Sequence, residues 1–125
     1  EDAGLKEKDI DYISAAANSS PDSDRIESRA IKEVFGQGPE SAAVSSIKSM
    51  IGESFSASGL LQIASAVDSI ANGFVPPTIN FKTRDDDCDF DYVNNKSRVS
   101  RINNVLINNF GPGGNNASVV VSKYQ

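Results

Sequence analysis

The segment from Val44 to Asn72 constrains the fold of this chain more than any other. A short β-rich run ends in small polar residues, turns at Gly52 and continues into an apolar helical pattern from about Phe55 to Asn72. A strand that leads through a loop into a helix N-terminus is the place where α/β folds put ligands and reactive groups. Lys48 and Glu53 are the ionisable residues on the two sides of this turn. The segment therefore predicts an α/β domain with a candidate site at the turn.

The rest of the chain supplies one further helix and several strands. We predict strands over residues 10–17 and 42–46, a helix from Pro21 to about Phe35, and two final strands over residues 102–110 and 117–124 with a tight loop between them. This order is typical of an α/β sheet with two main helices and a final antiparallel strand pair. A length of 125 residues allows one domain, over residues 1–125.

The two helices differ in the surface that they are expected to bury. In the helix from Pro21, apolar residues at helical spacing predict one buried stripe and charged residues predict a solvated face. The stripe comprises Ile26, Ala30, Ile31, Val34 and Phe35, and the charged face comprises Arg25, Glu27, Arg29, Lys32 and Glu33. The helix from Phe55 to Asn72 is apolar nearly all round, which predicts burial by neighbours that this short chain supplies in small number.

Composition excludes several classes of site. The chain has no histidine, which removes His-based zinc sites, Ser–His and Cys–His pairs, and the commonest general base. Its single cysteine, Cys88, lies among aspartates that should raise the thiol pKa, so we interpret it as non-catalytic and typical of a reducing cytoplasm. The net charge of −5 argues against nucleic acid as a partner, and no apolar run is long enough to span a membrane.

Two stretches invite a metal or phosphate interpretation that their details do not support. The run from Asp85 to Asp91 lacks the glycine and the distal glutamate of a calcium loop, which favours a solvated acidic loop. The glycine-rich stretch over residues 111–116 is followed by no helix, so we discount a nucleotide cradle. We predict neither a metal nor a cofactor.

Five stretches together resemble the C-terminal third of a β-ketoacyl-acyl-carrier-protein synthase of the thiolase fold. They begin at residues 1, 21, 44, 73 and 108 and read E-D-A-G-L with I-D-Y-I, P-D-S-D-R-I-E-S-R-A-I, V-S-S-I-K-S-M-I-G, G-F-V-P-P-T-I-N-F, and N-N-F-G-P-G-G-N-N-A-S-V-V. The resemblance implies the C-terminal half of a thiolase-like fold. The first strand of that half is not in this sequence, and we expect its place to be at the centre of the sheet. Residues 1–5 then form the last turn of an earlier helix. Because the chain starts with Glu1 rather than Met, we expect a fragment or a processed form.

The resemblance also implies where the reactive groups of this family would stand. The family condenses an acyl thioester with malonyl-acyl-carrier protein through a cysteine and two histidines, and the cysteine belongs to a region that is not in this sequence. A motif like A-H-G-T-S-T-P reads A-A-A-N-S-S-P here and places Ala16 at the first histidine. A motif like K-S-M-x-G-H retains Lys48 and places Glu53 at the second histidine, and Gln62 stands where the family has a glutamate.

The substrate-binding positions are matched in part. Asn18 and Ser20 correspond to the hydroxyls that hold the pantetheine arm. The loop that resembles G-F-G-G reads Gly111-Pro112-Gly113 after Phe110, with Pro112 at the gating phenylalanine. The partners that the resemblance implies are acyl carrier protein and a ketosynthase, in a homodimer or a heterodimer.

The two histidine replacements predict that the family mechanism is lost. Decarboxylation of a malonyl thioester needs hydrogen-bond donors aimed at the developing enolate oxygen, and losing one such donor costs about 10²–10³ in rate. Ala16 has no side-chain donor. An ionised Glu53 at a helix N-terminus would accept hydrogen bonds and repel both malonate and enolate.

Three functions remain open at this point. The first is a non-catalytic partner of an active synthase, similar to a chain-length factor, in which Lys48 is a structural ion-pair partner of Glu53. The second is an enzyme of altered chemistry, in which burial raises the Glu53 pKa and Lys48 tunes a general base. The third is a fragment of a condensing enzyme that another chain completes, since a lone chain would expose much of the apolar helix.

Overall fold

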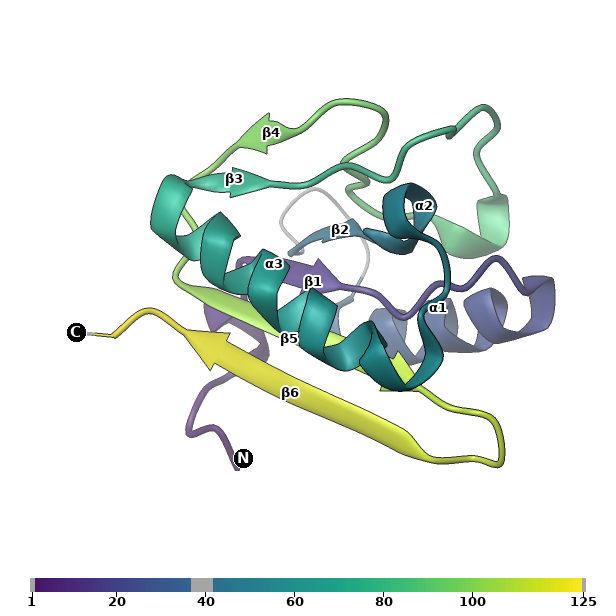
Figure 1. Cartoon of the computed structure of the whole chain (residues 1–125), viewed down its shortest axis with the longest axis horizontal. Coiled ribbons are helices and arrows are strands. Elements are labelled where there is room, and N and C mark those ends of the chain that lie inside the picture. The colour runs from purple at the N-terminus through teal and green to yellow at the C-terminus, as the bar shows by residue number, and fades with distance from the viewer. Residues whose placement is uncertain (1, 37–41, 125) are drawn as a thin grey trace.

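A mixed sheet organises the computed structural model, which describes residues 2–36 and 42–124 (Figure 1). The order of its four strands is β2-β1-β5-β6. They are β1 (Tyr12–Ser14), β2 (Ala43–Ser45), β5 (Asn104–Phe110) and β6 (Asn116–Ser122). β1 is parallel to β2 and to β5, whereas β5 and β6 are antiparallel. The predicted α/β class and the final antiparallel pair are confirmed.

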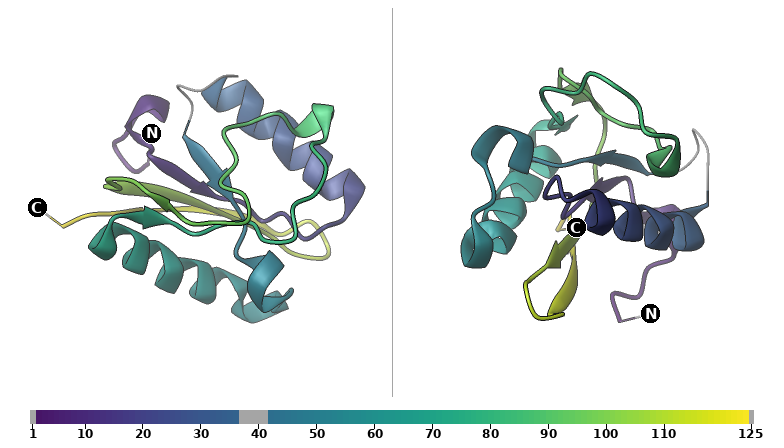
Figure 2. Two further views of the ribbon diagram at one scale, coloured as in Figure 1. Left: turned by 90° about the horizontal axis from the view of Figure 1, so that it is seen from above. Right: turned by 90° about the vertical axis from the view of Figure 1, so that its right-hand side faces the viewer.

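The two long helices cover opposite faces of this sheet (Figure 2). They are α1 (Pro21–Phe35) and α3 (Ser58–Asn72). α1 begins at a proline and ends at Gly36, as expected of a helix with these residues at its termini. The short helix α2 (Lys48–Ile51) stands where a loop was predicted. None of the helices in the described ranges is long and apolar enough to cross a membrane.

The smaller elements connect these layers. β3 (Phe74–Val75) and β4 (Arg98–Val99) form an antiparallel pair outside the main sheet, and neither strand was predicted. The single-turn 3-10 helices are Glu7–Asp9, Phe55–Ala57 and Asp86–Cys88. At the N-terminus, residues 2–3 form a turn rather than part of a helix, although Gly4 has the positive φ of 65° expected of a helix stop. Glu1, residues 37–41 between the predicted helix from Pro21 and the predicted strand over 42–46, and Gln125 lie outside the described residues.

The sheet has no room at its centre for the strand that the family resemblance placed there. β1 pairs directly with β5, in a register that sets Tyr12 beside Val105 and Ile13 beside Leu106. No strand can therefore insert between them, and the expected central position is wrong. The outer side of β2 is also engaged, because the backbone of Val44 exchanges hydrogen bonds of 3.0 and 3.1 Å with Asp91 and Val93. The outer side of β6 is the place where this sheet could extend.

Two apolar clusters form the core, one on each face of the sheet. The cluster under α3 contains Tyr12, Ala43, Ala66, Val75, Val93, Ile102, Val105 and Ile107. The cluster under α1 contains Ile10, Ile13, Ala15, Ile31, Ala42, Val44 and Phe90. Neighbouring strand residues point to opposite faces, so Tyr12 joins the first cluster and Ile13 joins the second.

The burial predicted for the two helices was partly wrong. α3 packs on the sheet through a stripe of small and polar residues, Ser58, Gln62, Ala66 and Ser69, while Leu60 is 72% exposed and Val67 is 53% exposed. The expectation that a lone chain exposes much of this helix is confirmed. In α1 the buried stripe lies on a different side of the helix from the predicted one. Ile31 is buried, but Ile26 and Val34 are exposed. The reason is that Glu27 and Ser28 face the sheet in their place.

Candidate functional site

The candidate site lies where the C-terminal ends of β1 and β2 open onto the same edge of the sheet. Because β1 and β2 are parallel neighbours, the loop after Ser14 and the loop after Ser45 emerge side by side. A cavity of about 700 Å³ lies at this edge and is also bounded by the hairpin loop between β5 and β6. Of the predicted site residues, it is lined by Ala16, Asn18, Glu53, Phe110, Gly111 and Pro112. Ser20, Lys48, Gln62 and Gly113 do not line it.

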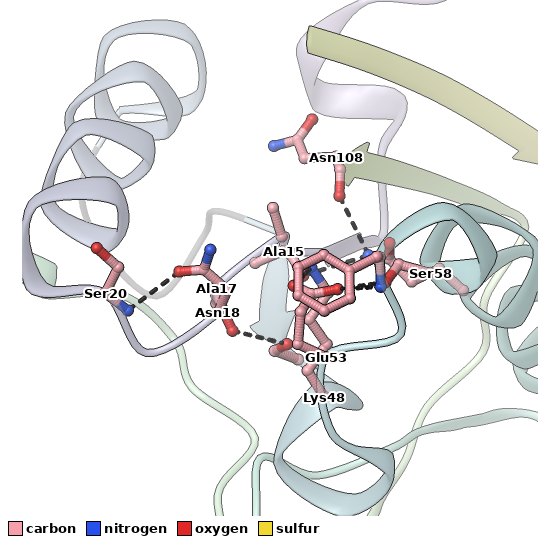
Figure 3. Close-up of polar contacts among 12 residues, drawn as sticks. Ala15, Ala17, Asn18, Ser20, Lys48, Glu53, Ser58 and Asn108 are labelled. Atoms are coloured by element: carbon pink, nitrogen blue, oxygen red, sulfur yellow. Dashed lines mark hydrogen bonds and ion pairs between the residues drawn. The ribbon is translucent and has the colours of Figure 1, made fainter. Parts of the chain in front are cut away.

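Glu53 is held by three donors at the entrance to α3 (Figure 3). Its Oε2 accepts a hydrogen bond of 2.8 Å from Lys48 Nζ, and its Oε1 accepts bonds of 2.6 Å from Ser58 Oγ and 2.8 Å from the backbone N–H of Phe55. Gly52, with a φ of 79°, makes the turn that brings the carboxylate back onto Lys48. The Lys48–Glu53 pair proposed from the sequence is thus present in the structure.

This environment fixes the charge of Glu53. Burial would raise the pKa of its carboxyl, but the hydrogen bonds from Lys48, Ser58 and the Phe55 backbone, together with the lysine charge, lower that pKa to about 2. The Lys48 side chain is only 5% exposed and the Glu53 side chain is 28% exposed, so the pair is largely shielded from solvent. At neutral pH the group is a carboxylate, which accepts hydrogen bonds and donates none.

Glu27 is a second carboxylate of this site, and its predicted place on the solvated face of α1 was wrong. The residue is 4% exposed. Its Oε1 and Oε2 accept hydrogen bonds of 2.9 Å from the backbone N–H groups of Ala16 and Ala17, and Oε1 also accepts one of 3.1 Å from Asn108 Nδ2. These bonds satisfy a buried charge and fix the loop that follows β1.

Ala16 therefore presents no donor of its own to the cavity. Its side chain is a methyl group and its backbone N–H is bound to Glu27. The loop then turns through Ala17 and Ser19, which have positive φ values of 20° and 68°. Asn18 Oδ1 accepts a 3.0 Å hydrogen bond from the backbone N–H of Ser20, the residue that precedes α1 (Figure 3). The amide of Asn18 thus shapes the loop as well as lining the cavity.

Gln62 lies in the interior and not against Lys48. The side chain is 1% exposed, and its Nε2 lies 3.2 Å from each of four oxygen acceptors. These acceptors are the backbone oxygens of Ser14, Ala15 and Asn108 and the hydroxyl of Ser14. The amide therefore ties α3 to the ends of β1 and β5, behind the cavity.

The hairpin loop closes the other side of the cavity. The backbone N–H of Gly111 donates a 2.8 Å hydrogen bond to Asn115 O, which narrows the loop. Gly113 and Gly114 have φ values of 90° and 84°, which suit glycine alone. Pro112, which directly precedes these two glycines in the sequence, is part of the cavity wall.

The acidic loop lies apart from this cavity, against α1. Asp87 pairs with Arg25 at 2.9 Å, Asp91 pairs with Arg98, and Asp89 pairs with Arg84. Cys88 accepts a 3.0 Å hydrogen bond from Ser28 Oγ. The predicted acidic loop is thus partly neutralised by arginines, an arrangement that the sequence interpretation did not include.

Sequence reasoning missed Glu27, Asp24, Asn108 and Ser58. A signal for Glu27 existed, because Asp24, Glu27, Ile31 and Phe35 lie at helical spacing on one face of α1. Ser58 lies five residues after Glu53 and hydrogen-bonds to it. This contact could be predicted only if the conformation of the turn before α3 were known.

Comparisons with known proteins identify relatives of this chain and agree with its fold. Residues 1–82 match the family described as beta-ketoacyl synthase, C-terminal domain. The chain is 43% identical over 122 residues to 3-oxoacyl-acyl-carrier-protein synthase 2 of Coxiella burnetii, which covers 98% of this chain and 30% of that protein. The solved ishigamide ketosynthase/chain length factor superposes with a TM-score of 0.94 at 35% identity, over 99% of this chain and 30% of that one.

A second solved structure is a type II polyketide synthase acyl-carrier protein in complex with its ketosynthase bound to the hexaketide. It matches with a TM-score of 0.92 at 32% identity, again over 99% of this chain and 30% of that one. The chain thus spans about 30% of the length of these relatives.

Proposed function

Since this chain belongs to the β-ketoacyl synthase family through its C-terminal domain, we propose that it is part of a non-catalytic ketosynthase-like protein. In this role it acts with an active β-ketoacyl-acyl-carrier-protein synthase in fatty-acid or polyketide chain elongation. Residues 1–125 are then one partial domain of that protein. The observation that carries the proposal is the carboxylate of Glu53, which Lys48 holds at 2.8 Å.

Decarboxylation needs hydrogen-bond donors at the two positions where the family has histidines. In this chain we place Ala16 and Glu53 at these positions, and neither side chain donates. Glu53 has a pKa of about 2 and accepts three hydrogen bonds, so it has no proton to offer an enolate oxygen. Ala16 offers a methyl group, and its N–H is bound to Glu27. A negative charge beside the cavity would also raise the energy of an enolate.

An altered enzyme that uses Glu53 as a general base finds no support in this geometry. A useful base has a pKa near the working pH, and burial was expected to raise the Glu53 pKa toward that value. The opposite shift, to about 2, makes the carboxylate a very weak base. Lys48 is committed to the ion pair and is 5% exposed, so it is poorly placed to act on a ligand.

Two surfaces support the proposed partners. The cavity, with Asn18 and residues 110–112 in its lining, suits a pantetheine arm delivered by an acyl carrier protein. The exposed apolar side of α3, with Leu60, Leu61 and Val67, suits a covering layer from the rest of the fold or from a ketosynthase partner in a dimer. The solved relatives include an acyl-carrier protein in complex with its ketosynthase, and a ketosynthase/chain length factor.

The proposal is tested by decarboxylation of malonyl-acyl-carrier protein. The longer protein that contains this chain is assayed alone and with candidate partner synthases, beside a variant that carries Ala16→His and Glu53→His. We expect no turnover by the protein alone and elongation only with a partner. Turnover by the protein alone, lost in Glu53→Gln, would contradict the proposal.

A further inference from the structure

Phe55 has a backbone conformation that an aromatic residue rarely adopts. Its φ is 48°, which lies in the left-handed region. In that region the Cβ atom of an L-residue crowds the following carbonyl oxygen, so the conformation is unfavourable for residues other than glycine. The chain has glycine at the turns before and after α3, where Gly52 has a φ of 79° and Gly73 has a φ of 70°. At residue 55 it keeps an aromatic side chain and the strain that comes with it.

Burial of the Phe55 ring does not offset this strain. The residue is 69% exposed, although its side chain is large and apolar. It is also part of the lining of the cavity beside Glu53. Residues held in strained backbone conformations cluster at ligand sites, where the surrounding structure fixes them. A ring in a cavity wall loses its contact with water when a ligand fills the cavity, which favours binding.

Glu53 holds Phe55 in this conformation. Its Oε1 accepts hydrogen bonds of 2.8 Å from the backbone N–H of Phe55 and 2.6 Å from Ser58 Oγ, and its Oε2 accepts one of 2.8 Å from Lys48 Nζ. Both carboxylate oxygens are therefore fixed, and one of them fixes the strained residue. The turn before α3 and the position of the Phe55 ring thus depend on the same carboxylate.

The rest of the lining suits a long uncharged ligand with amide groups. A second aromatic side chain, Phe110, comes from the end of β5, and the side-chain amides of Asn18, Asn109 and Asn115 add donors and acceptors. A pantetheine arm consists of two amides joined by methylene groups, with a geminal dimethyl group near one end. Its apolar parts match the aromatic rings and its amides match the asparagines.

We infer that Phe55 sets the affinity of this cavity for the pantetheine arm and that Glu53 is the residue that positions Phe55. The inference rests on the proposed function, which places the arm in this cavity. It gives the carboxylate at residue 53 a role that requires no proton transfer. It also explains why a strained aromatic residue stands where glycine would be more favourable.

Stability measurements test whether the ring is kept for binding and not for folding. In the chain of 125 residues, Phe55→Gly removes the strain, so its Tm should lie about 3 °C or more above that of Phe55→Ala. Leu60 is the matched control, because it is 72% exposed and lies within α3. There the order should reverse, with Leu60→Gly melting below Leu60→Ala. The same order at both positions, or a Tm of Phe55→Gly more than about 4 °C below the wild type, would overturn the inference.

Binding is measured by titrating S-acetylpantetheine into the longer protein that contains this chain. Phe55→Gly and Phe55→Ala should each bind the probe about tenfold more weakly than the wild type, because both lose the ring. Phe55→Tyr keeps the ring and should bind within about twofold of the wild type. Equal affinity of the wild type and these variants, or no binding by the wild type, would overturn the inference.

A double substitution separates positioning by Glu53 from a direct contact between Glu53 and the probe. Glu53→Ala removes the acceptor of the Phe55 N–H and should weaken binding about fivefold, whereas Glu53→Gln retains an acceptor oxygen and should restore most of the affinity. In a protein that already carries Phe55→Gly, Glu53→Ala should add less than about twofold, because the residue that it positions has lost its ring. Losses that multiply in the double variant, or equal losses in Glu53→Ala and Glu53→Gln, would overturn the positioning role.

The two proposals can fail separately. An affinity that does not depend on Phe55 would overturn this inference and leave the non-catalytic role standing. Turnover of malonyl-acyl-carrier protein by the longer protein alone would overturn that role, while the affinities for S-acetylpantetheine would still decide the role of Phe55.

Discussion

Lys48 Nζ lies 2.8 Å from Glu53 Oε2, across the turn at Gly52. By resemblance, we place this lysine at the lysine of the synthase motif and Glu53 at the second histidine of that motif. Because the lysine side chain is 5% exposed, the carboxylate beside it offsets the cost of burying its charge. The pair therefore ties the start of α2 to the turn that precedes α3.

Removal of the anion should destabilise the fold. Glu53→Gln leaves the buried Lys48 ammonium without its partner, and we expect the free energy of unfolding to fall by about 1–3 kcal/mol. Denaturant unfolding measures the change. Glu33→Gln, at an exposed position of α1, is the matched control and should change stability by less than about 0.5 kcal/mol. An equal effect of the two variants would show that the pair carries no stability.

The stabilisation by Glu53 should disappear in acid. Its pKa falls from an ordinary value of 4.5 to about 2 in the fold. A lowered pKa stabilises the fold at every pH above the unfolded value, and this contribution is lost as the pH falls from about 4.5 to about 2. The difference in Tm between the wild type and Glu53→Gln should be constant at higher pH and shrink over that window. A difference that does not change down to about pH 2 would contradict the lowered pKa.

Glu27 should control the loop after β1. Glu27→Gln retains one acceptor but turns an amide N–H toward the backbone N–H groups of Ala16 and Ala17. We expect a loss of about 1–3 kcal/mol in unfolding free energy and large shifts of these two backbone amide signals. Unchanged amide signals would rule out the two hydrogen bonds.

We expect Gln62 to stabilise the fold through the hydrogen bonds of its side-chain amide and not through its volume. Gln62→Leu keeps a side chain of similar volume but leaves the backbone oxygens of Ser14, Ala15 and Asn108 without this donor. We expect unfolding free energy to fall by about 2–4 kcal/mol, as buried acceptors lose their partner. Ala64→Leu, on the exposed side of α3, is the control. A stable Gln62→Leu variant would show that the amide is dispensable.

The two sides of α3 should respond differently to substitution. Leu60→Ser and Val67→Ser alter exposed positions and should change the stability of the lone chain by less than about 0.5 kcal/mol, while weakening association with any covering partner. Ala66→Leu overfills a position with no exposed surface and should cost about 1–3 kcal/mol. Unfolding and sedimentation measurements separate the two effects, and unchanged association in the serine variants would show that this side is not an interface.

The main elements could be predicted because they rest on local signals. Helical spacing with Pro21 and Gly36 at its ends defines α1, and the glycines after Phe110 define the final hairpin. The Lys48–Glu53 pair could be predicted for the same reason, because both residues border one turn.

The remaining features depend on contacts between distant parts of the chain. The partners of Glu27 come from the loop after β1 and from β5, so its spacing with Ile31 and Phe35 could indicate burial but could not identify the groups that bind it. Gln62 finds its acceptors on two strands. β3 and β4 are two residues long, too short for any periodic pattern to appear.

Titration of the Glu53 side-chain carboxyl by carbon NMR tests most directly whether this residue, which we propose to occupy the family's second histidine position, is a carboxylate held by Lys48. The structure predicts a midpoint of about 2, with the signal moving back toward the ordinary value of 4.5 in a Lys48→Met variant. A midpoint well above 4.5 would contradict it. Such a value would mean that the carboxyl holds a proton that it could donate.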